Sequence, residues 1–326
     1  MQTNELVDLL YSSGIDHIAI KPVNDFESQT KSLINDIFPQ TRSVIACALS
    51  YNDINNQNSD TTYGFIPAYT VRNYYRILSK KIDTSIKTFL KNIGLENKLS
   101  EYYRLSVNSK TDEKLLASAC GLGFIGNNSV LQPYGNGSLF IIGIAFLSVD
   151  LDKYVEIPNS TNCGNCNLCI ESCPTGALTK NGFNKEICIH HLSNCDHWPD
   201  IINKKTINEL WCTRFFGCNR CVTVCPNNQN NSCRIFNDTD YSTGFIGYSF
   251  DPEKILSVNR NELKKLFIKN QLSLNWISDF SLIRNGLLAI TNNGNTENIA
   301  CYLQNHHLNQ FNSLEKEIIN KLLIKI

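Results

Sequence analysis

The sequence lacks an excess of charge of either sign. Thirty Lys and Arg residues balance thirty Asp and Glu residues, and charged residues make up only 18% of the 326 positions. This balance excludes a generally basic nucleic-acid coat protein and an acidic tail protein, although it leaves room for a local patch. The hydrophobic fraction of 42% is enough to bury a core, which excludes a disordered chain.

Long apolar segments and an export signal are also missing. The longest apolar run, Leu139 to Val149, is too short to span a bilayer and contains Gly143. The first ten residues carry the acids Glu5 and Asp8 and show no basic region followed by an apolar stretch. We therefore expect a cytoplasmic protein with no membrane association. In that compartment, grouped thiols indicate metal or redox chemistry in place of disulfides.

Cysteine is what the sequence has in quantity. There are fourteen, and ten of them lie between Cys163 and Cys225. The first run, CGNCNLCIESCP from Cys163 to Pro174, has the C-x2-C-x2-C-x3-C-P spacing of a bacterial ferredoxin cluster site. Four cysteines within eleven residues are too crowded for one tetrahedral zinc ion. The spacing therefore indicates a [4Fe–4S] cluster.

A second run, FFGCNRCVTVCP, repeats the last steps of the motif but has Phe215 where its first cysteine is expected. In paired clusters the last cysteine of each run ligates the other cluster. The first cluster then has Cys163, Cys166, Cys169 and Cys225 as ligands. The second has Cys173, Cys218 and Cys221 and lacks one ligand, for which the candidates are Cys188, Cys195 and Cys212. Two linked clusters indicate electron transfer and not only a structural role.

The other cysteines suggest no site. Cys47, in an apolar strand, and Cys120, before a glycine-rich turn, are expected to pack in the core. Cys233 and Cys301 show no partner pattern.

The chain divides into three predicted parts, which together make an α+β multidomain fold. Residues 1–155 alternate strand patterns at Thr41–Tyr51 and Leu139–Leu147 with a helix at Ala68–Leu90, as an α/β domain does. Residues 156–235 hold the cysteine runs and form a ferredoxin-like module. Residues 236–326 read as helical, with a capping box at Asn259–Glu262 and helices at Leu282–Ile290, Ile299–Leu303 and Ile318–Ile326.

A glycine-rich turn, GLGFIG from Gly121 to Gly126, matches G-x-G-x-x-G. It follows a helix, whereas a dinucleotide fingerprint follows a strand and opens a helix, so it does not predict NAD binding. Glycines do leave room for backbone to approach a large flat cofactor.

The order of these features resembles the epoxyqueuosine reductase family. The residues that carry the resemblance are GLGFIGNNS, the cysteine runs ending in CPTGA and CPNN, and SLIRNGLLAI from Ser281 to Ile290. The resemblance implies a cytoplasmic, monomeric enzyme, related to reductive dehalogenases, with a cobalamin and two [4Fe–4S] clusters. Such an enzyme reduces epoxyqueuosine to queuosine in tRNA, taking electrons from an external ferredoxin- or flavodoxin-type donor and relaying them through the clusters to cobalt.

The resemblance also implies site residues. It selects Cys188 as the fourth ligand of the second cluster, and it makes the first domain the cobalamin-binding one, with a HEAT-like tail completing the substrate surface. The implied cofactor-binding residues are Asn108, Gly121, Gly123, Phe124, Ile125, Gly126 and Asn128.

Several polar positions depart from the family pattern. Where the family has an Asp as general acid, this chain has Val107 or Asn108, and an amide cannot supply a titrating proton. Asp112 and Glu113 lie close by and are the candidate catalytic acids. A family Lys is replaced by Asn127, and a family Asp and His are replaced by Asn73 and Tyr75.

These departures keep two alternatives open. One is a paralogous cobalamin and iron–sulfur reductase of another substrate. The other is a non-catalytic ferredoxin-type electron carrier, with side chains filling the space over the glycine turn. Residues 235–326 contain nine basic and nine acidic residues, which weighs mildly against tRNA because phosphate contacts normally need a basic face.

Overall fold

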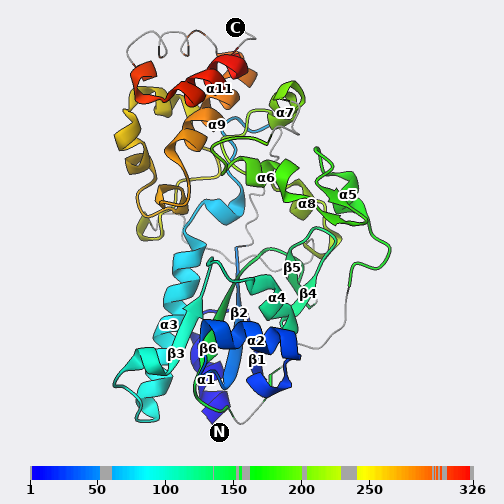
Figure 1. Cartoon of the computed structure of the whole chain (residues 1–326), viewed down its shortest axis with the longest axis vertical. Coiled ribbons are helices and arrows are strands. Elements are labelled where there is room, and N and C mark those ends of the chain that lie inside the picture. The colour runs from blue at the N-terminus through cyan, green and yellow to red at the C-terminus, as the bar shows by residue number, and fades with distance from the viewer. Residues whose placement is uncertain are drawn as a thin grey trace. The chain divides into compact units, whose positions relative to one another are not determined.

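The computed structural model describes residues 2–51, 61–134, 136–151, 154–155, 162–199, 204–228, 241–295, 297, 299, 302 and 307–323. The chain forms two compact units, each built from separate stretches of sequence (Figure 1). The first unit comprises Met1–Asn52, Tyr74–Asn167 and Cys225–Arg234, and the second comprises Asp53–Asn73, Leu168–Val224 and Ile235–Ile326. The division into domains 1–155, 156–235 and 236–326 stays a prediction.

A four-stranded sheet organises the first unit. Its strand order is β1-β2-β6-β3, with bounds β1 His17–Pro22, β2 Ser43–Ser50, β6 Phe140–Leu147 and β3 Tyr103–Ser106. The strands predicted around β2 and β6 are thereby confirmed. All three neighbouring pairs are antiparallel. The predicted mixture of helices and strands is confirmed for this unit, and the antiparallel pairing supplies a strand direction that the sequence analysis did not predict.

Helices cover both faces of this sheet (Figure 1). On one face, α2 (Ser28–Ile37) and α4 (Glu113–Ala119) enclose a core that includes Val44, Ala46 and Phe146. On the other face, α3 (Tyr74–Asn92) packs so closely that a Cβ on Gly143 would meet Leu78 and Ile82. Next to α3 lies α1 (Gln2–Ser12). This unit also contains three short 3-10 helices: η1 Val23–Asp25, η3 Leu99–Glu101 and η5 Pro226–Asn228.

The first unit also carries a small hairpin of β4 (Gly123–Ile125) and β5 (Leu131–Pro133). The predicted core cysteines lie in this unit. Cys47 and Cys120 are both fully buried, as expected, and the Cys120 Sγ lies 3.5 Å from the carbonyl oxygens of Ala19 and Val44. Cys233 and Cys301 lie outside the described residues.

Short helices and turns make up most of the second unit. Among its α-helices are α5 Leu168–Glu171, α6 Ile189–Leu192, α7 Lys204–Trp211, α8 Arg220–Thr223, α9 Asp279–Asn292 and α11 Ser313–Leu323. A two-stranded hairpin joins β7 (Leu178–Thr179) to β8 (Gly182–Phe183). Its 3-10 helices are η2 Ala68–Thr70, η4 Lys185–Ile187, η6 Tyr241–Thr243, η7 Pro252–Ser257, η8 Arg260–Phe267, η9 Gln271–Ser273 and η10 His307–Gln310.

An aromatic core explains why the second cysteine run lacks its first cysteine. Phe215 is fully buried, and its ring lies 4.7 Å from that of Phe250 and 5.8 Å from that of Phe267. Phe215 also lies beneath α9 at Gly286. The position therefore serves hydrophobic packing.

Helix starts in the tail differ from the prediction. Asn259 precedes η8, but its side chain makes no capping hydrogen bond, and Glu262 instead pairs with Lys265. The predicted capping box was therefore wrong. A reciprocal box does form at the start of α11, where the Asn312 Oδ1 accepts from the Glu315 N–H and the Glu315 carboxylate accepts from the Asn312 N–H. The predicted helix at Leu282–Ile290 lies within α9, and residues 300, 301 and 303 of Ile299–Leu303 lie outside the described residues.

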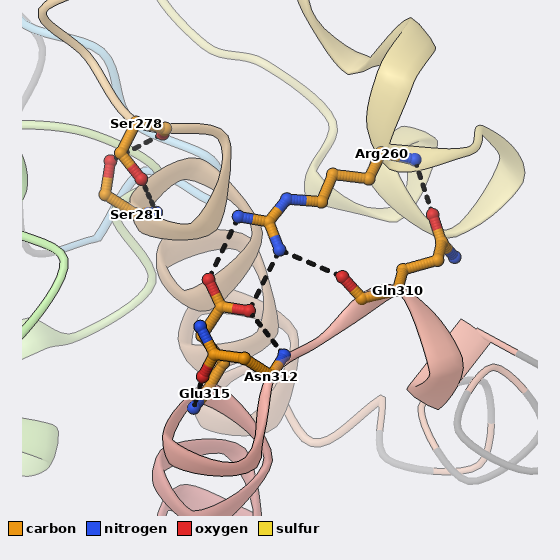
Figure 2. Close-up of polar contacts among 6 residues, drawn as sticks. All are labelled: Arg260, Ser278, Ser281, Gln310, Asn312 and Glu315. Carbon is orange, nitrogen blue, oxygen red and sulfur yellow. Dashed lines mark hydrogen bonds and ion pairs between the residues drawn. The ribbon is translucent and has the colours of Figure 1, made fainter.

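A bidentate ion pair joins η8 to the start of α11 (Figure 2). The Arg260 guanidinium donates to both carboxylate oxygens of Glu315 at 2.9 Å and to the carbonyl oxygen of Gln310 at 3.0 Å. Burial would raise the pKa of Glu315, but hydrogen bonds from Arg260 and from the Asn312 N–H outweigh it and lower that pKa. The hydrogen bond to Glu315 in turn raises the pKa of Arg260.

Glu315→Gln is expected to destabilise the second unit by about 1–3 kcal/mol at neutral pH, because a buried charge-assisted hydrogen bond is lost. A carboxyl whose pKa is lowered by folding stabilises the fold above its unfolded pKa, and this contribution disappears as the pH falls through the folded pKa. The difference between variant and wild type should therefore shrink in acid. Urea unfolding followed by tryptophan fluorescence measures it, since Trp198, Trp211 and Trp276 all lie in this unit.

The matched control is Glu262→Gln, which alters an exposed pair with Lys265 and should have a much smaller effect. Equal losses for the two variants at all pH values would contradict this role for Glu315.

Candidate metal centre and adjoining cavity

Four thiols of the second unit lie close together. Cys173 follows α5, Cys188 precedes α6, and Cys218 and Cys221 lie before and within α8. Burial is the largest cause of the raised pKa of the Cys221 thiol, and the charges of Cys218, Cys188 and Cys173 raise this pKa further. Burial likewise raises the pKa of Cys188, with added effects of Cys218 and Cys173. The structure thus brings together the three motif cysteines and the one candidate ligand that the resemblance selected.

This donor set fits a polynuclear cation. Burial, and then the charges of neighbouring thiolates, raise the pKa of Cys188, Cys218 and Cys221, and a bound positive centre removes that penalty. Within the described ranges, no three His, Cys, Asp or Glu side chains are close enough to hold a single metal ion. A [4Fe–4S] cube is larger than one ion and uses one thiolate for each iron.

The two other candidates for this ligand position lie in different surroundings. The Cys195 Sγ is 3.3 Å from the Nε2 of His191, and the Glu186 carboxylate is 4.0 Å from that ring. Cys212 follows α7 with a positive φ of 54°, and its Sγ faces the carbonyl oxygens of Glu209 and Leu210.

A second thiol group lies in the first unit. Burial raises the pKa of Cys225, and the charges of Cys163 and Cys166 raise it further. The remaining predicted ligand, Cys169, lies in α5 of the second unit. Its assignment to the first cluster rests on the motif spacing.

Asn127 connects the glycine-rich turn to this thiol group. Its backbone N–H donates to the Sγ of Cys163 at 3.3 Å, and its Nδ2 donates to the carbonyl oxygen of Cys166 at 2.8 Å. An N–H directed at a thiolate sulfur stabilises the charge there and tunes the reduction potential of a bound cluster. The position therefore belongs to the iron–sulfur site.

The tail motif around Arg284 holds the segment after Cys188. The Arg284 guanidinium, only 1% exposed, donates to the carbonyl oxygens of Leu192 and Cys195 and lies over the Trp198 ring at 4.9 Å. Burial lowers the pKa of Arg284 to about 9. Asn285 donates to the carbonyl oxygen of Ser193 at 2.9 Å. The motif thus positions a ligand-bearing loop.

Sequence reasoning missed Tyr69, which lies beside the same loop. Its hydroxyl is 2.8 Å from the Nδ1 of His190 and donates to the carbonyl oxygen of Cys218. Burial and the charge of His191 lower the pKa of His190 to about 4. No local pattern marks Tyr69, because it is far from both partners along the chain.

A cavity of about 200 Å³ opens within the first unit. It lies among the start of α3, the start of α4, strand β5 and the start of β6. Its lining residues are Tyr75, Asn108, Glu113, Lys114, Val130, Leu131, Phe140, Ile141 and Ile142. An apolar wall with a few polar side chains is typical of a small-molecule site.

The turn between β3 and α4 brings Asn108 to this cavity. Asn108 has a left-handed backbone with φ of 52°, which Asn tolerates better than most residues. The Oε1 of Glu113 holds the turn by accepting from the Ser109 N–H at 2.8 Å and the Ser106 hydroxyl at 3.0 Å. Of the two candidate acids, Glu113 lines the cavity. Asp112 caps α4 by accepting from the Leu115 N–H and is not a lining residue.

The glycine-rich turn is shaped by the hairpin that follows it. A Cβ on Gly123 would lie 2.1 Å from the backbone oxygen of Gln132, and one on Gly126 would lie 2.2 Å from its side-chain nitrogen. Gln132 therefore occupies the space beside both glycines. Of the residues expected to bind a cofactor, only Asn108 lines the cavity.

The remaining expected cofactor residues have structural contacts. Gly121 follows α4 with a φ of 90°, and the Phe124 ring stacks on Tyr134 at 5.9 Å. Buried Asn128 accepts from the Val130 N–H and donates to the Ser138 hydroxyl, while Ile125 is exposed.

Asn73, one of the departures from the family pattern, is engaged in the second unit, where it donates to the carbonyl oxygen of Lys269. Among the described helices, none combines the length and apolar character needed to span a bilayer.

The family model for a 4Fe-4S double cluster binding domain matches residues 162–228. This match confirms the prediction of two [4Fe–4S] clusters from the cysteine spacing.

Comparison with known proteins extends the similarity along the chain. The chain is 24% identical over 320 residues to the epoxyqueuosine reductase of Bacillus subtilis, covering 88% of this chain and 78% of the relative. It superimposes on epoxyqueuosine reductase from Streptococcus thermophilus with a TM-score of 0.75 at 20% identity, covering 98% and 89% of the two chains. An epoxyqueuosine reductase with a tRNA-Tyr epoxyqueuosine-modified tRNA stem loop matches with a TM-score of 0.69 at 19% identity, over 99% and 98%.

Cys188→Ser is expected to halve the iron content of anaerobically reconstituted protein, from about eight irons per chain to about four, because the second cluster loses a ligand. Iron and sulfide analysis with electron paramagnetic resonance measures the loss. Cys195→Ser and Cys212→Ser are matched controls that should keep about eight irons. A loss for Cys195→Ser with full occupancy for Cys188→Ser would reverse the ligand assignment.

Proposed function

The chain is a homologue of the epoxyqueuosine reductases, and from this premise we propose that it reduces epoxyqueuosine to queuosine in tRNA. The proposed enzyme acts in the cytoplasm as a monomer, with two [4Fe–4S] clusters and a cobalamin. An external donor of the ferredoxin or flavodoxin type supplies the electrons. The reaction consumes one epoxide, two electrons and two protons, and it yields one carbon–carbon double bond and one water.

One observation carries this proposal: a single turn connects the iron–sulfur site to the cavity. Asn127 contacts Cys163 and Cys166, and Val130, three residues further on, lines the cavity. A redox group at the cavity would therefore lie close to the first thiol group. The proposed ligands are Cys163, Cys166, Cys169 and Cys225 for the first cluster and Cys173, Cys188, Cys218 and Cys221 for the second.

The cavity fits part of a large cofactor. Binding sites of drug-sized ligands typically enclose 300–1,000 Å³, so a cavity of about 200 Å³ would enclose only one ring of a substrate or part of a corrinoid. The aliphatic wall of Val130, Leu131, Ile141 and Ile142 suits such an edge. When bound, cobalamin supplies low-valent cobalt as a strong nucleophile or one-electron donor.

This chain's own residues have three proposed tasks. The apolar wall excludes water, the Asn108 amide orients the reacting oxygen by hydrogen bonding, and an acid supplies the proton. Asp112 and Glu113 are the acids proposed from the sequence. Of these two, only Glu113 lines the cavity, whereas Asp112 caps α4. A HEAT-like tail over residues 236–326 is proposed to complete the surface for tRNA.

A reductase of another substrate is the second candidate. Its support is the set of polar departures from the family pattern at Asn108, Asn127 and Tyr75, two of which line the cavity. The balanced charge of the tail also favours a smaller substrate.

Anaerobic reconstitution with iron, sulfide and cobalamin tests these functions. We expect about eight irons and one cobalamin per chain, seen in the UV–visible spectrum. With a low-potential reductant, the protein should convert an epoxyqueuosine-containing anticodon stem-loop to the queuosine form, detected by nucleoside mass spectrometry. Cobalamin binding without conversion would favour another substrate, and eight irons without cobalamin would indicate an electron carrier.

A further inference from the structure

Three side chains that line the cavity carry a proton that can be transferred. They are Tyr75 at the start of α3, and Glu113 and Lys114 at the start of α4. Asn108 lines the same cavity, but its amide can only donate a hydrogen bond. The proton donor of a reaction in this cavity is therefore to be sought among these three.

Two of the three are already engaged by the fold. Glu113 accepts through Oε1 from the Ser109 N–H, a donor that cannot reverse its role, and from the Ser106 hydroxyl. Both contacts use this carboxyl oxygen as a hydrogen-bond acceptor. The Lys114 ammonium donates to the carbonyl oxygen of Ser129 at 3.0 Å. Both side chains thus serve the framework of the cavity.

Tyr75 differs from them because its hydroxyl makes no hydrogen bond to any residue in the described part of the chain. Burial, and then the negative charge of Glu113, raise the pKa of Tyr75 to about 12. The phenol therefore keeps its proton throughout the physiological range. The phenol is still a stronger acid than an alcohol, so proton transfer from it to an alkoxide oxygen that is leaving carbon is favourable.

Few other charges act on this phenol. The sheet strands against which α3 packs, β2 and β6, contain no charged residue. On α1, Glu5 accepts from Asn92 at the opposite end of α3, and Asp8 is exposed. Glu113 and Lys114 are thus the charged side chains that share the cavity with Tyr75.

We propose that Tyr75 is the proton donor of this site, giving its phenolic proton to the epoxide oxygen as the carbon–oxygen bond breaks, with Glu113 as a positioning residue. This proposal rests on the proposed epoxide reduction. The external reductant supplies both electrons, Tyr75 supplies the first proton, and solvent supplies the second proton and reprotonates the phenolate. The oxygen leaves as water.

The first test is the single-turnover rate of the reconstituted enzyme with an epoxyqueuosine-containing stem-loop. Tyr75→Phe should lower the rate by about 10²-fold, the usual contribution of a general acid. Stem-loop affinity, cobalamin content and iron content should not change. The matched control is Tyr103→Phe, which removes the same hydroxyl from a tyrosine bonded to Asp83 outside the cavity and should react at the wild-type rate.

The pH profile separates Tyr75 from a carboxyl donor. With a phenol whose pKa is about 12, the rate should stay level as the pH rises from neutral to mildly alkaline. With Glu113 or Asp112 as donor, it would fall tenfold per pH unit above the pKa of that carboxyl. Glu113→Gln keeps an oxygen that accepts from the Ser109 N–H, so it should lower the rate less than Tyr75→Phe does.

A second readout needs neither cofactor nor turnover. Fluorotyrosine placed at position 75 reports ionisation of that phenol by fluorine NMR. Its pKa should exceed that of the same fluorotyrosine at an exposed position, and Glu113→Gln should lower it.

Wild-type turnover that persists in Tyr75→Phe, or a fluorotyrosine that titrates as an exposed one, would overturn the role of Tyr75 and leave the epoxide reduction standing. A wild-type protein that does not convert the epoxide would overturn the proposed function, and this role with it.

Discussion

Mutual repulsion among closely spaced thiolates is the constraint on which this structure depends. Cys173, Cys188, Cys218 and Cys221 come from three segments of the chain, and burial, followed by the charges of neighbouring thiolates, raises the pKa of Cys188, Cys218 and Cys221. Such a group is favourable only around a positive centre. The surrounding polar contacts serve this requirement: Arg284 and Asn285 fix the loop after Cys188, and Tyr69 bonds to the carbonyl of Cys218.

A single turn connects the thiol group of the first unit to the cavity. The N–H of Asn127 is directed at the sulfur of Cys163, and the chain then runs through β5 into the cavity wall. The sequence analysis interpreted the glycines of this turn as leaving space for a cofactor. In the structure, Gln132 occupies the space beside Gly123 and Gly126. The turn therefore links the two sites by its backbone.

The cavity itself is organised by one carboxylate. Glu113 ties together Ser106 and Ser109 and thereby fixes the left-handed Asn108 at the cavity. The same charge acts on Tyr75 and holds its proton more firmly. Glu113, which the sequence analysis named as a candidate proton donor, thus acts in the structure as a hydrogen-bond acceptor. Tyr75 entered the sequence comparison only as a replacement for another residue, because nothing local to α3 reveals what faces it.

The sequence by itself determined the clusters, the buried strands β2 and β6, and most of α3 and α9. Ligand spacing along a loop and apolar runs are local properties, so they can be read without the fold. It misjudged the capping box at Asn259, where no such box forms, whereas the same four-residue pattern at Asn312 does form one, and there Arg260 also binds the Glu315 carboxylate. Only the tertiary structure decided the antiparallel sheet, the gathering of Cys188 with three distant thiols, and the cavity. Each of these joins residues far apart in the chain, and their contacts depend on packing that no short stretch of sequence contains.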